Sequence, residues 1–112
     1  MTVTAELFRR LALALPGATE GSHQGHPDFR CEAGVFATLP DPATGMVRVP
    51  NELQRTLVAR AGGAFWPANG AWGRAGCTML RLGDVDEATL RDALTAAWQF
   101  ALASAAARRS KK

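Results

Sequence analysis

The chain has 112 residues, of which 47% are hydrophobic and 21% are charged. This length and composition exclude a multidomain, fibrous or intrinsically disordered protein and indicate one globular domain that folds without a metal or a disulfide. No apolar run approaches the ~18 residues that span a bilayer. The amino end has Glu6 ahead of two arginines and no basic cluster, unlike a secretory signal, so we expect a cytoplasmic protein.

The formal net charge of +3 is unevenly distributed along the chain. The last five residues contribute four of the 13 basic residues, which leaves 9 basic against 10 acidic residues in the rest. Within that part, residues 51–82 have a net charge of +3 and residues 83–107 a net charge of −3. A local excess of positive charge favours contact with a polyanion, so this distribution matters more for function than the total.

The predicted elements begin with a helix over residues 4–15, whose apolar side chains recur at helical spacing. Thr4 caps its amino end, and Pro16 and Gly17 end it. Short apolar runs separated by turn residues then predict three strands, at residues 29–31, 35–39 and 46–49. The turns between these strands are short, so we expect antiparallel pairing.

The rest of the chain is predicted to contain two helices and one strand. A helix over residues 50–61 ends at two glycines. Residues 64–76 form a loop rich in glycine and tryptophan, and residues 77–82 form a strand. The last helix has the strongest apolar periodicity, and Asp84 with Glu87 resembles a capping box at its start.

Together these elements predict an α+β domain in which a single antiparallel β-sheet is packed with helices, in the order α-β-β-β-α-β-α. We expect the domain to cover residues 1–106 and residues 107–112 to form a basic, disordered tail. Cys31 and Cys77 stand far apart, which in a reducing compartment favours two small buried thiols. The sequence leaves open a disulfide between them.

Five short segments distributed along the chain form a characteristic series. They are Leu13–Gly17 (LALPG), Gly25–Arg30 (GHPDFR), Val35–Thr38 (VFAT), Ala71–Thr78 (AWGRAGCT) and Ala96–Trp98 (AAW). In this order they resemble the MmcQ/YjbR family, and the resemblance extends from about Leu7 to Leu102. It implies a frataxin-like (CyaY-like) α+β fold and a DNA-binding role through a double-wing arrangement.

The sequence departs from that family's pattern at three places. Gln24 stands where members often have Trp before Gly-His-Pro, and Gly34 and Val35 fill a turn that often contains Lys. In the aromatic loop, Ala75 and Cys77 stand where the family often has Arg and Trp. Most of these changes remove a base or an aromatic ring that a nucleic-acid surface would use.

Arginines of the predicted strands, second helix and aromatic loop are the candidate nucleic-acid contacts. If one face of the sheet stays open, they form a basic patch that holds DNA phosphates weakly and in a salt-dependent way. The candidates are Arg30, Arg48, Arg55, Arg74 and Arg81. The alternative is scattered surface charge, with the arginines paired to Glu32, Glu52 and Asp28.

The aromatic loop offers a second kind of candidate site. Its indole rings stack on bases or, with His26, line a groove for a protein or a small molecule, near Trp66 and Trp72. The alternative is that both tryptophans are buried beneath the loop, which the average burial of tryptophan favours. A non-catalytic domain that binds an unknown protein or small molecule is therefore the alternative function.

Patterns for catalysis and metal binding are weak. His23, His26 and Cys31 lie close in sequence, but a structural zinc site needs four ligands at recognised spacings. No Ser or Cys has the local signature of an activated nucleophile, and the glycines of the aromatic loop lack the strand and helix of a nucleotide-binding motif. We therefore expect no metal, no cofactor and no catalysis, and an enzyme that uses His26 is the remaining alternative.

Overall fold

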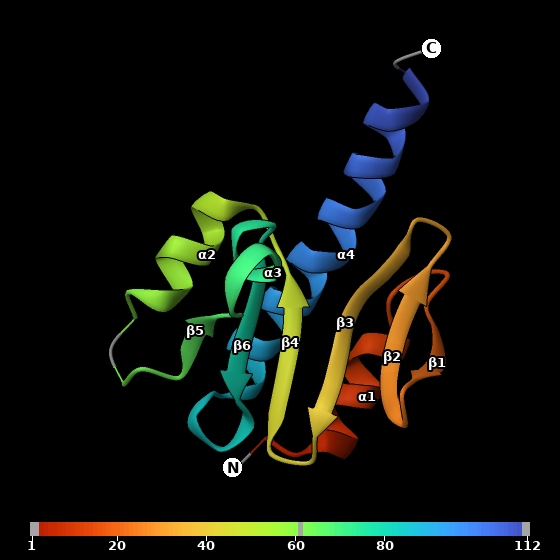
Figure 1. Ribbon diagram of the computed structural model, residues 1–112. Helices are drawn as coiled ribbons and strands as arrows, with labels where there is room; N and C mark the ends of the chain where they lie inside the picture. Colours follow the sequence, from red (N-terminus) through yellow and green to blue (C-terminus); the bar gives the residue numbers. More distant parts are fainter. Residues whose placement is uncertain (1–2, 61, 111–112) are drawn as a thin grey trace.

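The computed structural model describes residues 3–60 and 62–110. Within them the chain forms four α-helices and one six-stranded antiparallel sheet, which confirms the predicted α+β class (Figure 1). The helices are α1 (Ala5–Leu13), α2 (Asn51–Val58), α3 (Gly70–Arg74) and α4 (Glu87–Ser110). The strands are β1 (Thr19–His23), β2 (His26–Cys31), β3 (Gly34–Asp41), β4 (Thr44–Arg48), β5 (Phe65–Pro67) and β6 (Cys77–Arg81).

The element order differs from the prediction by three additions, β1, β5 and α3. β1 has the polar sequence TEGSH, without the apolar alternation that marks a strand. It forms because a two-residue turn folds the chain back onto β2, with Gln24 and Gly25 at φ of 53° and 82°. β5 and α3 have only three and five residues, too few to show a period in the sequence.

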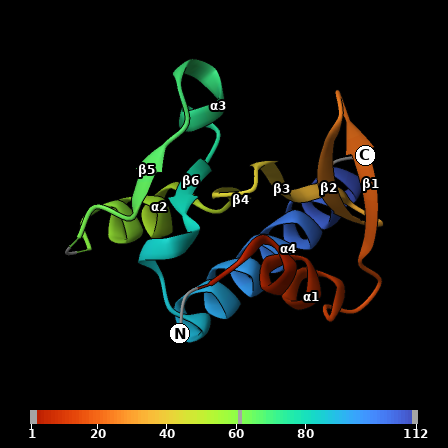
Figure 2. The same ribbon diagram turned by 90° about the horizontal axis from the view of Figure 1, so that it is seen from below.

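The sheet has the strand order β1-β2-β3-β4-β6-β5, and α1 and α4 pack on one of its faces, with α2 next to α4 and against β5. α1 contacts β2 and β4, and α4 contacts β2, β3 and β4. Figure 2 shows α1 and α4 on one side of the sheet, whereas α3 and the β1–β2 hairpin rise on the other. We call this second side, opposite α1 and α4, the open face.

The hydrophobic core lies between the sheet and these two helices. Phe8 of α1 and Phe29 of β2 are completely buried, and their ring centroids are 5.7 Å apart. Trp98 of α4 packs at the edge of the core and donates a hydrogen bond from Nε1 to the carbonyl oxygen of Pro16, 3.0 Å away. This contact ties α4 to the segment that follows α1.

The predicted capping box of the last helix is wrong. Asp84 lies in a 3₁₀ turn (Leu82–Asp84), and α4 begins only at Glu87. The cap is Asp86, whose Oδ1 accepts a hydrogen bond from the backbone N–H of Thr89 at 2.7 Å. The shift arises because Val85 is extended and packs into the core, which separates the turn from the helix.

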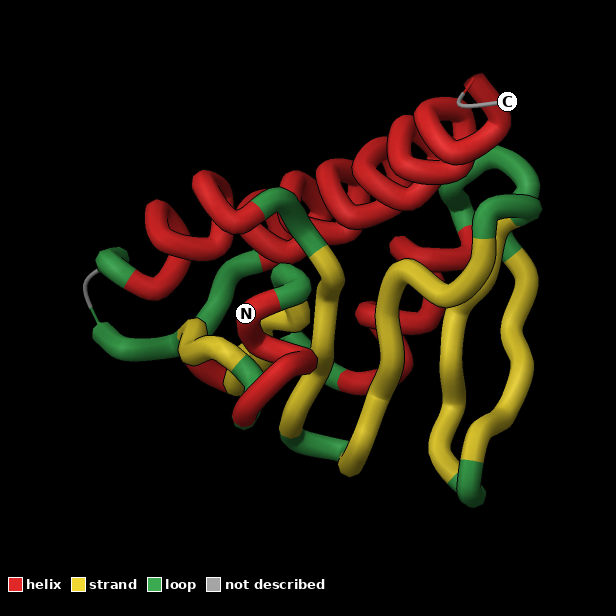
Figure 3. Tube along the Cα trace, turned by 45° about the horizontal axis from the view of Figure 1, so that its top comes forward, coloured by secondary structure: helices red, strands yellow, loops and turns green. Residues whose placement is uncertain are grey.

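The carboxyl end of α4 is longer than expected. The helix continues through Ser110, so residues 107–110 of the predicted tail are helical, and residues 111 and 112 lie outside the described residues. Alanines dominate this stretch, and alanine has the highest helix propensity. Figure 3 shows α4 crossing the sheet and continuing past its edge.

Replacing Asp86 with alanine is expected to lower the melting temperature at neutral pH, because α4 loses its cap. Hydrogen bonds from Thr89 lower the pKa of the Asp86 carboxyl, so the folded chain holds this proton less tightly than the unfolded chain. The stabilisation is therefore complete above the unfolded pKa of about 3.9 and is lost as the pH falls through the lower folded pKa.

Thermal melts of wild type and D86A between about pH 7 and about pH 2 measure this effect. The difference in melting temperature between wild type and D86A should become smaller as the pH falls. D86N keeps a capping oxygen without a titrating proton and serves as the control. A difference that persists at the acid end would contradict the assignment of Asp86.

Candidate functional site

Three candidate arginines, Arg30, Arg48 and Arg81, lie on strands beside completely buried residues such as Phe29. Since neighbouring residues of a strand point to opposite faces, the backbone positions of all three belong to the open face, but the side chain of Arg48 reaches around to Phe100 of α4. β2 and β4 run in the same direction and β6 in the opposite one. Arg30 and Arg48 are therefore at one end of the sheet, and Arg81 is at the other.

Arg30 forms a two-point ion pair with Asp28 on the same strand. Its Nε lies 2.8 Å from Oδ1 and its Nη2 lies 3.0 Å from Oδ2. Asp28 is only 1% exposed, and its hydrogen bonds and negative charge raise the pKa of Arg30. Asp28 is one of the carboxylates named in the scattered-charge alternative, and it neutralises the positive charge of Arg30.

Arg81 is also paired. Its Nη1 lies 3.0 Å from Oδ2 of Asp84, and its guanidinium carbon lies 5.2 Å from the ring centroid of Trp66. Trp66 is half-buried on β5, where it pairs with Met79 of β6. The indole of Trp66 is thus covered by an arginine of its own chain.

The remaining three candidates lie on three elements that meet near the end of β4. Arg48 is the last residue of that strand, and its guanidinium carbon lies 4.9 Å from the ring centroid of Phe100 on α4. Arg74 ends α3, and Arg55 lies one turn into α2. Within the described part of the chain, no carboxylate forms an ion pair with any of them. We call Arg48, Arg55 and Arg74 the basic end.

Hydrogen bonds between α2 and α3 hold the basic end together. Nδ2 of Asn51 donates to the carbonyl oxygen of Arg74 at 3.0 Å. Nε2 of Gln54, a buried side chain, donates to the carbonyl oxygens of Gly73 and Cys77 at 3.0 and 3.1 Å. The start of α2 therefore fixes the position of α3, and with it the backbone that carries Arg74.

Two glycines allow α3 to approach its neighbours. A Cβ on Gly73 would overlap the carbonyl oxygen of Ala68. A Cβ on Gly76 would overlap the carbonyl oxygen of Val49, and Gly76 also has a φ of +100°. The backbone N–H of Val49 donates to the carbonyl oxygen of Gly76 at 3.0 Å, so β4 and the end of α3 are in direct contact.

An open pocket of about 440 Å³ lies between α2, α3 and β5. Its lining consists of Asn51, Gln54, Pro67, Ala68, Gly70, Gly73 and Arg74. Arg74 is the charged side chain at its rim. Sequence reasoning singled out Arg74 but missed Asn51 and Gln54, whose role depends on the docking of two segments about 20 residues apart in the chain.

The prediction that both tryptophans of the aromatic loop are buried is wrong for Trp72, which is 73% exposed. Trp72 lies on α3, whose five residues rise from the open face (Figure 2). A helix this short has no second layer above it to cover an indole. The average burial of tryptophan therefore fails at this position.

The structure separates His26 from the two tryptophans. His26 starts β2, whereas Trp66 and Trp72 lie on β5 and α3, and three strands stand between them. An exposed His26 instead lines a different pocket of about 450 Å³, at the end of the sheet where β3 turns into β4. The single groove predicted from His26, Trp66 and Trp72 does not form.

The cysteines are both free, which settles the pairing left open by the sequence. Burial raises the pKa of the Cys77 thiol, and the positive charge of Arg48 partly opposes this. In the described part of the chain, no group of three or more His, Cys, Asp or Glu side chains is placed to hold a metal ion. The side chain of His23 lies outside the described residues.

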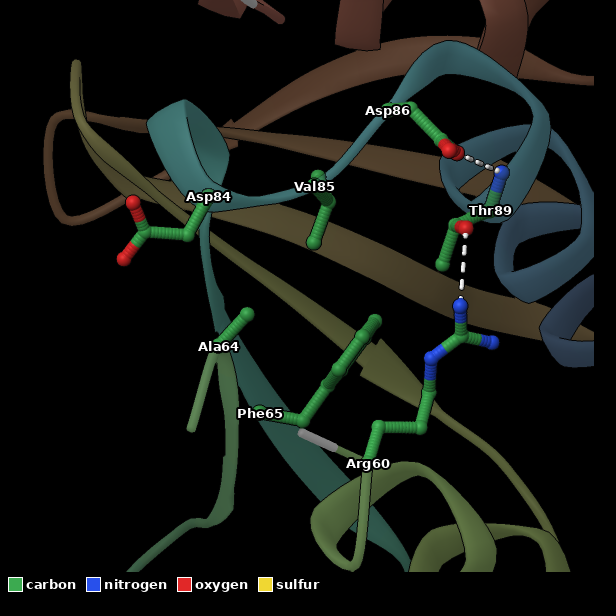
Figure 4. A pocket seen from close by; sticks show the side chains of 7 residues that line it. All are labelled: Arg60, Ala64, Phe65, Asp84, Val85, Asp86 and Thr89. Atoms are coloured by element: carbon green, nitrogen blue, oxygen red, sulfur yellow. Dashed lines mark hydrogen bonds between the residues drawn. The ribbon is translucent and has the colours of Figure 1, made fainter. Parts of the chain in front are cut away.

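Sequence reasoning also missed a small pocket of about 100 Å³ at the start of α4 (Figure 4). Arg60, Asp84, Asp86 and Thr89 are its polar lining residues. Nη2 of Arg60 donates to Oγ1 of Thr89 at 3.4 Å, and Asp86 caps the helix beside it. These polar groups support the start of α4, and the pocket is smaller than a typical ligand site.

Among the helices that the structure describes, none combines the length and the apolar character needed to span a bilayer. A search of curated proteins finds no match to the chain. A family model described as YjbR matches residues 13–100, which is well over half of the chain. The match includes every strand of the sheet and all five of the short segments on which the resemblance rests. The chain therefore belongs to the YjbR family.

Proposed function

We propose that the domain is a non-catalytic, cytoplasmic DNA-binding module that holds phosphates with its basic end. The supporting observation is that Arg48, Arg55 and Arg74, from three different elements, lie near one end of the sheet without a carboxylate partner in the described part of the chain. A guanidinium that is not already paired keeps its hydrogen-bond donors for phosphate oxygens.

Arg30 and Arg81 have a smaller part in this proposal. Each is half-exposed and keeps N–H groups that its carboxylate does not use, but Asp28 and Asp84 offset its charge. Because the chain without its last five residues has one more acidic than basic residue, the affinity for DNA is expected to be weak and strongly salt-dependent.

Replacing Arg55 and Arg74 together with glutamine is expected to weaken binding to a short labelled duplex by about tenfold or more at low salt. The loss of two phosphate contacts should also reduce the slope of log K against log salt by about 1.8. Both side chains are exposed, so the fold should be unaffected. Fluorescence anisotropy at several salt concentrations measures both effects.

The matched control is R10Q, which removes one exposed arginine from α1, on the covered side of the sheet. A second comparison deletes residues 108–112, whose four basic residues attract any polyanion. The proposal is overturned if the deletion abolishes binding while the double variant binds like wild type, because the folded domain would then make no contact with DNA.

A second candidate function is the binding of a small molecule at the pocket of about 450 Å³ near His26. Three prolines and Leu39 give it an apolar lining, and its volume falls in the range of ligand sites. A compound bound there would raise the melting temperature of wild type more than that of H26A. If no compound of a metabolite panel raises the melting temperature of wild type more than that of H26A, this second candidate function is contradicted.

A further inference from the structure

Trp72 stands out among the aromatic residues because its indole is 73% exposed. Its neighbours on α3 are Ala71 and Gly73, so no bulky side chain of adjacent residues covers the ring. Trp66, by contrast, is half-buried and lies beneath Arg81. Because the indole is the largest aromatic side chain, Trp72 leaves a large apolar surface in contact with water, and it adds nothing to the core.

The backbone that presents Trp72 is fixed. Hydrogen bonds from Gln54 and Asn51 reach the carbonyl oxygens of Gly73 and Arg74, the two residues that follow Trp72. The close approach at Gly73 and Gly76 holds the same segment against its neighbours. An aromatic ring on a fixed platform loses little conformational entropy when it binds a flat partner.

The charges around Trp72 indicate what that partner is. Arg74 lies two residues further along α3, and Arg55 lies on the helix to which α3 is docked. No carboxylate pairs with either guanidinium in the described residues. A flat apolar ring that shares a short helix with an unpaired positive charge complements a nucleotide, which combines an aromatic base with a phosphate.

We propose that Trp72 stacks on an unpaired base and that the domain thereby prefers single-stranded DNA to duplex. This inference rests on the proposed function, since it assigns the phosphates of the same strand to the basic end. In a duplex both faces of each base are covered by neighbouring bases, so the indole gains nothing. In a single strand a base is free to stack on Trp72 while the flanking phosphate meets Arg74.

The test compares three oligomers of equal length and label: a thymidine single strand, an abasic strand with the same phosphates, and a duplex. Wild type is expected to bind the thymidine strand about tenfold or more better than the abasic strand. W72A should lose this preference and bind both strands alike, with its affinity for duplex unchanged. W72F, which keeps a smaller ring, should retain part of the preference.

The outcomes separate the two proposals. If wild type binds none of the oligomers, the proposed function fails and this inference fails with it. If wild type binds, but W72A discriminates between thymidine and abasic strands as wild type does, or wild type favours duplex, the preference for single strands is overturned while DNA binding stands. R55Q/R74Q should weaken binding to all three oligomers. Because Trp72 is exposed, W72A should melt like wild type, which excludes misfolding as the cause.

Discussion

Replacing Gly76 with alanine is expected to lower the free energy of unfolding by about 4 kcal/mol. At a φ of +100° an alanine is strained, and its Cβ would overlap the carbonyl oxygen of Val49, which belongs to the backbone and cannot rotate away. The hydrogen bond from the N–H of Val49 to Gly76 would stretch or break. Urea denaturation, followed by far-UV circular dichroism, measures the change.

The matched control for Gly76 is Gly70, which has a φ of +63° but nothing within 4 Å of an added Cβ. G70A should therefore show only the backbone strain of about 1–2 kcal/mol. The difference between the two variants isolates the contact between β4 and the end of α3. If G76A and G70A had the same free energy of unfolding, the close packing between β4 and the end of α3 would be contradicted. Since G76A displaces the segment of Trp72 and Arg74, it should also weaken DNA binding.

Replacing Phe29 with alanine is expected to cost about 3–5 kcal/mol, the range for a large side chain removed from a core. Phe29 is completely buried, and its ring packs on that of Phe8, so the variant leaves a cavity between β2 and α1. The denaturation midpoint should fall while the dependence of stability on urea stays the same.

Val35 provides the control for Phe29, because it is 39% exposed and pairs with Arg30 on the open face. V35A is expected to change stability by less than about 0.5 kcal/mol. The comparison tests the register itself, since a shift of β2 by one residue would exchange Phe29 with Arg30. A larger loss for V35A than for F29A would mean that the two faces of the sheet are reversed.

The five arginines proposed to contact DNA are divided by the fold. Sequence reasoning proposed five arginines that converge, whereas the fold brings Arg48, Arg55 and Arg74 to one end and leaves Arg81 at the other. Arg30 lies at the same end as Arg48 but is held by Asp28, two residues before it. The scattered-charge alternative already named Asp28 as a partner for an arginine, and the i, i+2 spacing of Asp28 and Arg30 on one strand face is the signal for this particular pair.

The site also depends on two residues that had no signal in the sequence. Asn51 and Gln54 lie within the predicted helix over residues 50–61, but the pattern that predicts this helix gives neither side chain a partner. Gln54 is buried because α3 docks on α2 and its carbonyl oxygens need donors. A side chain that satisfies the backbone of a distant segment cannot be recognised before that segment is placed.

What the sequence by itself determined was the class of the domain and most of its elements, because apolar periodicity and turn residues act over a few neighbouring positions. The helix after Thr4, the three central strands and the long final helix follow from such local patterns. The series of short segments also determined the family. These features need no knowledge of distant contacts.

Only the tertiary structure decided which side chains meet and which remain exposed. It gave Arg30 a buried partner, left Trp72 uncovered on a five-residue helix and separated His26 from the tryptophans. It also added β1, whose polar residues form a strand because β2 offers hydrogen bonds beside it. Exposure and pairing depend on segments far apart in the chain, and burial in this fold is set by where those segments pack.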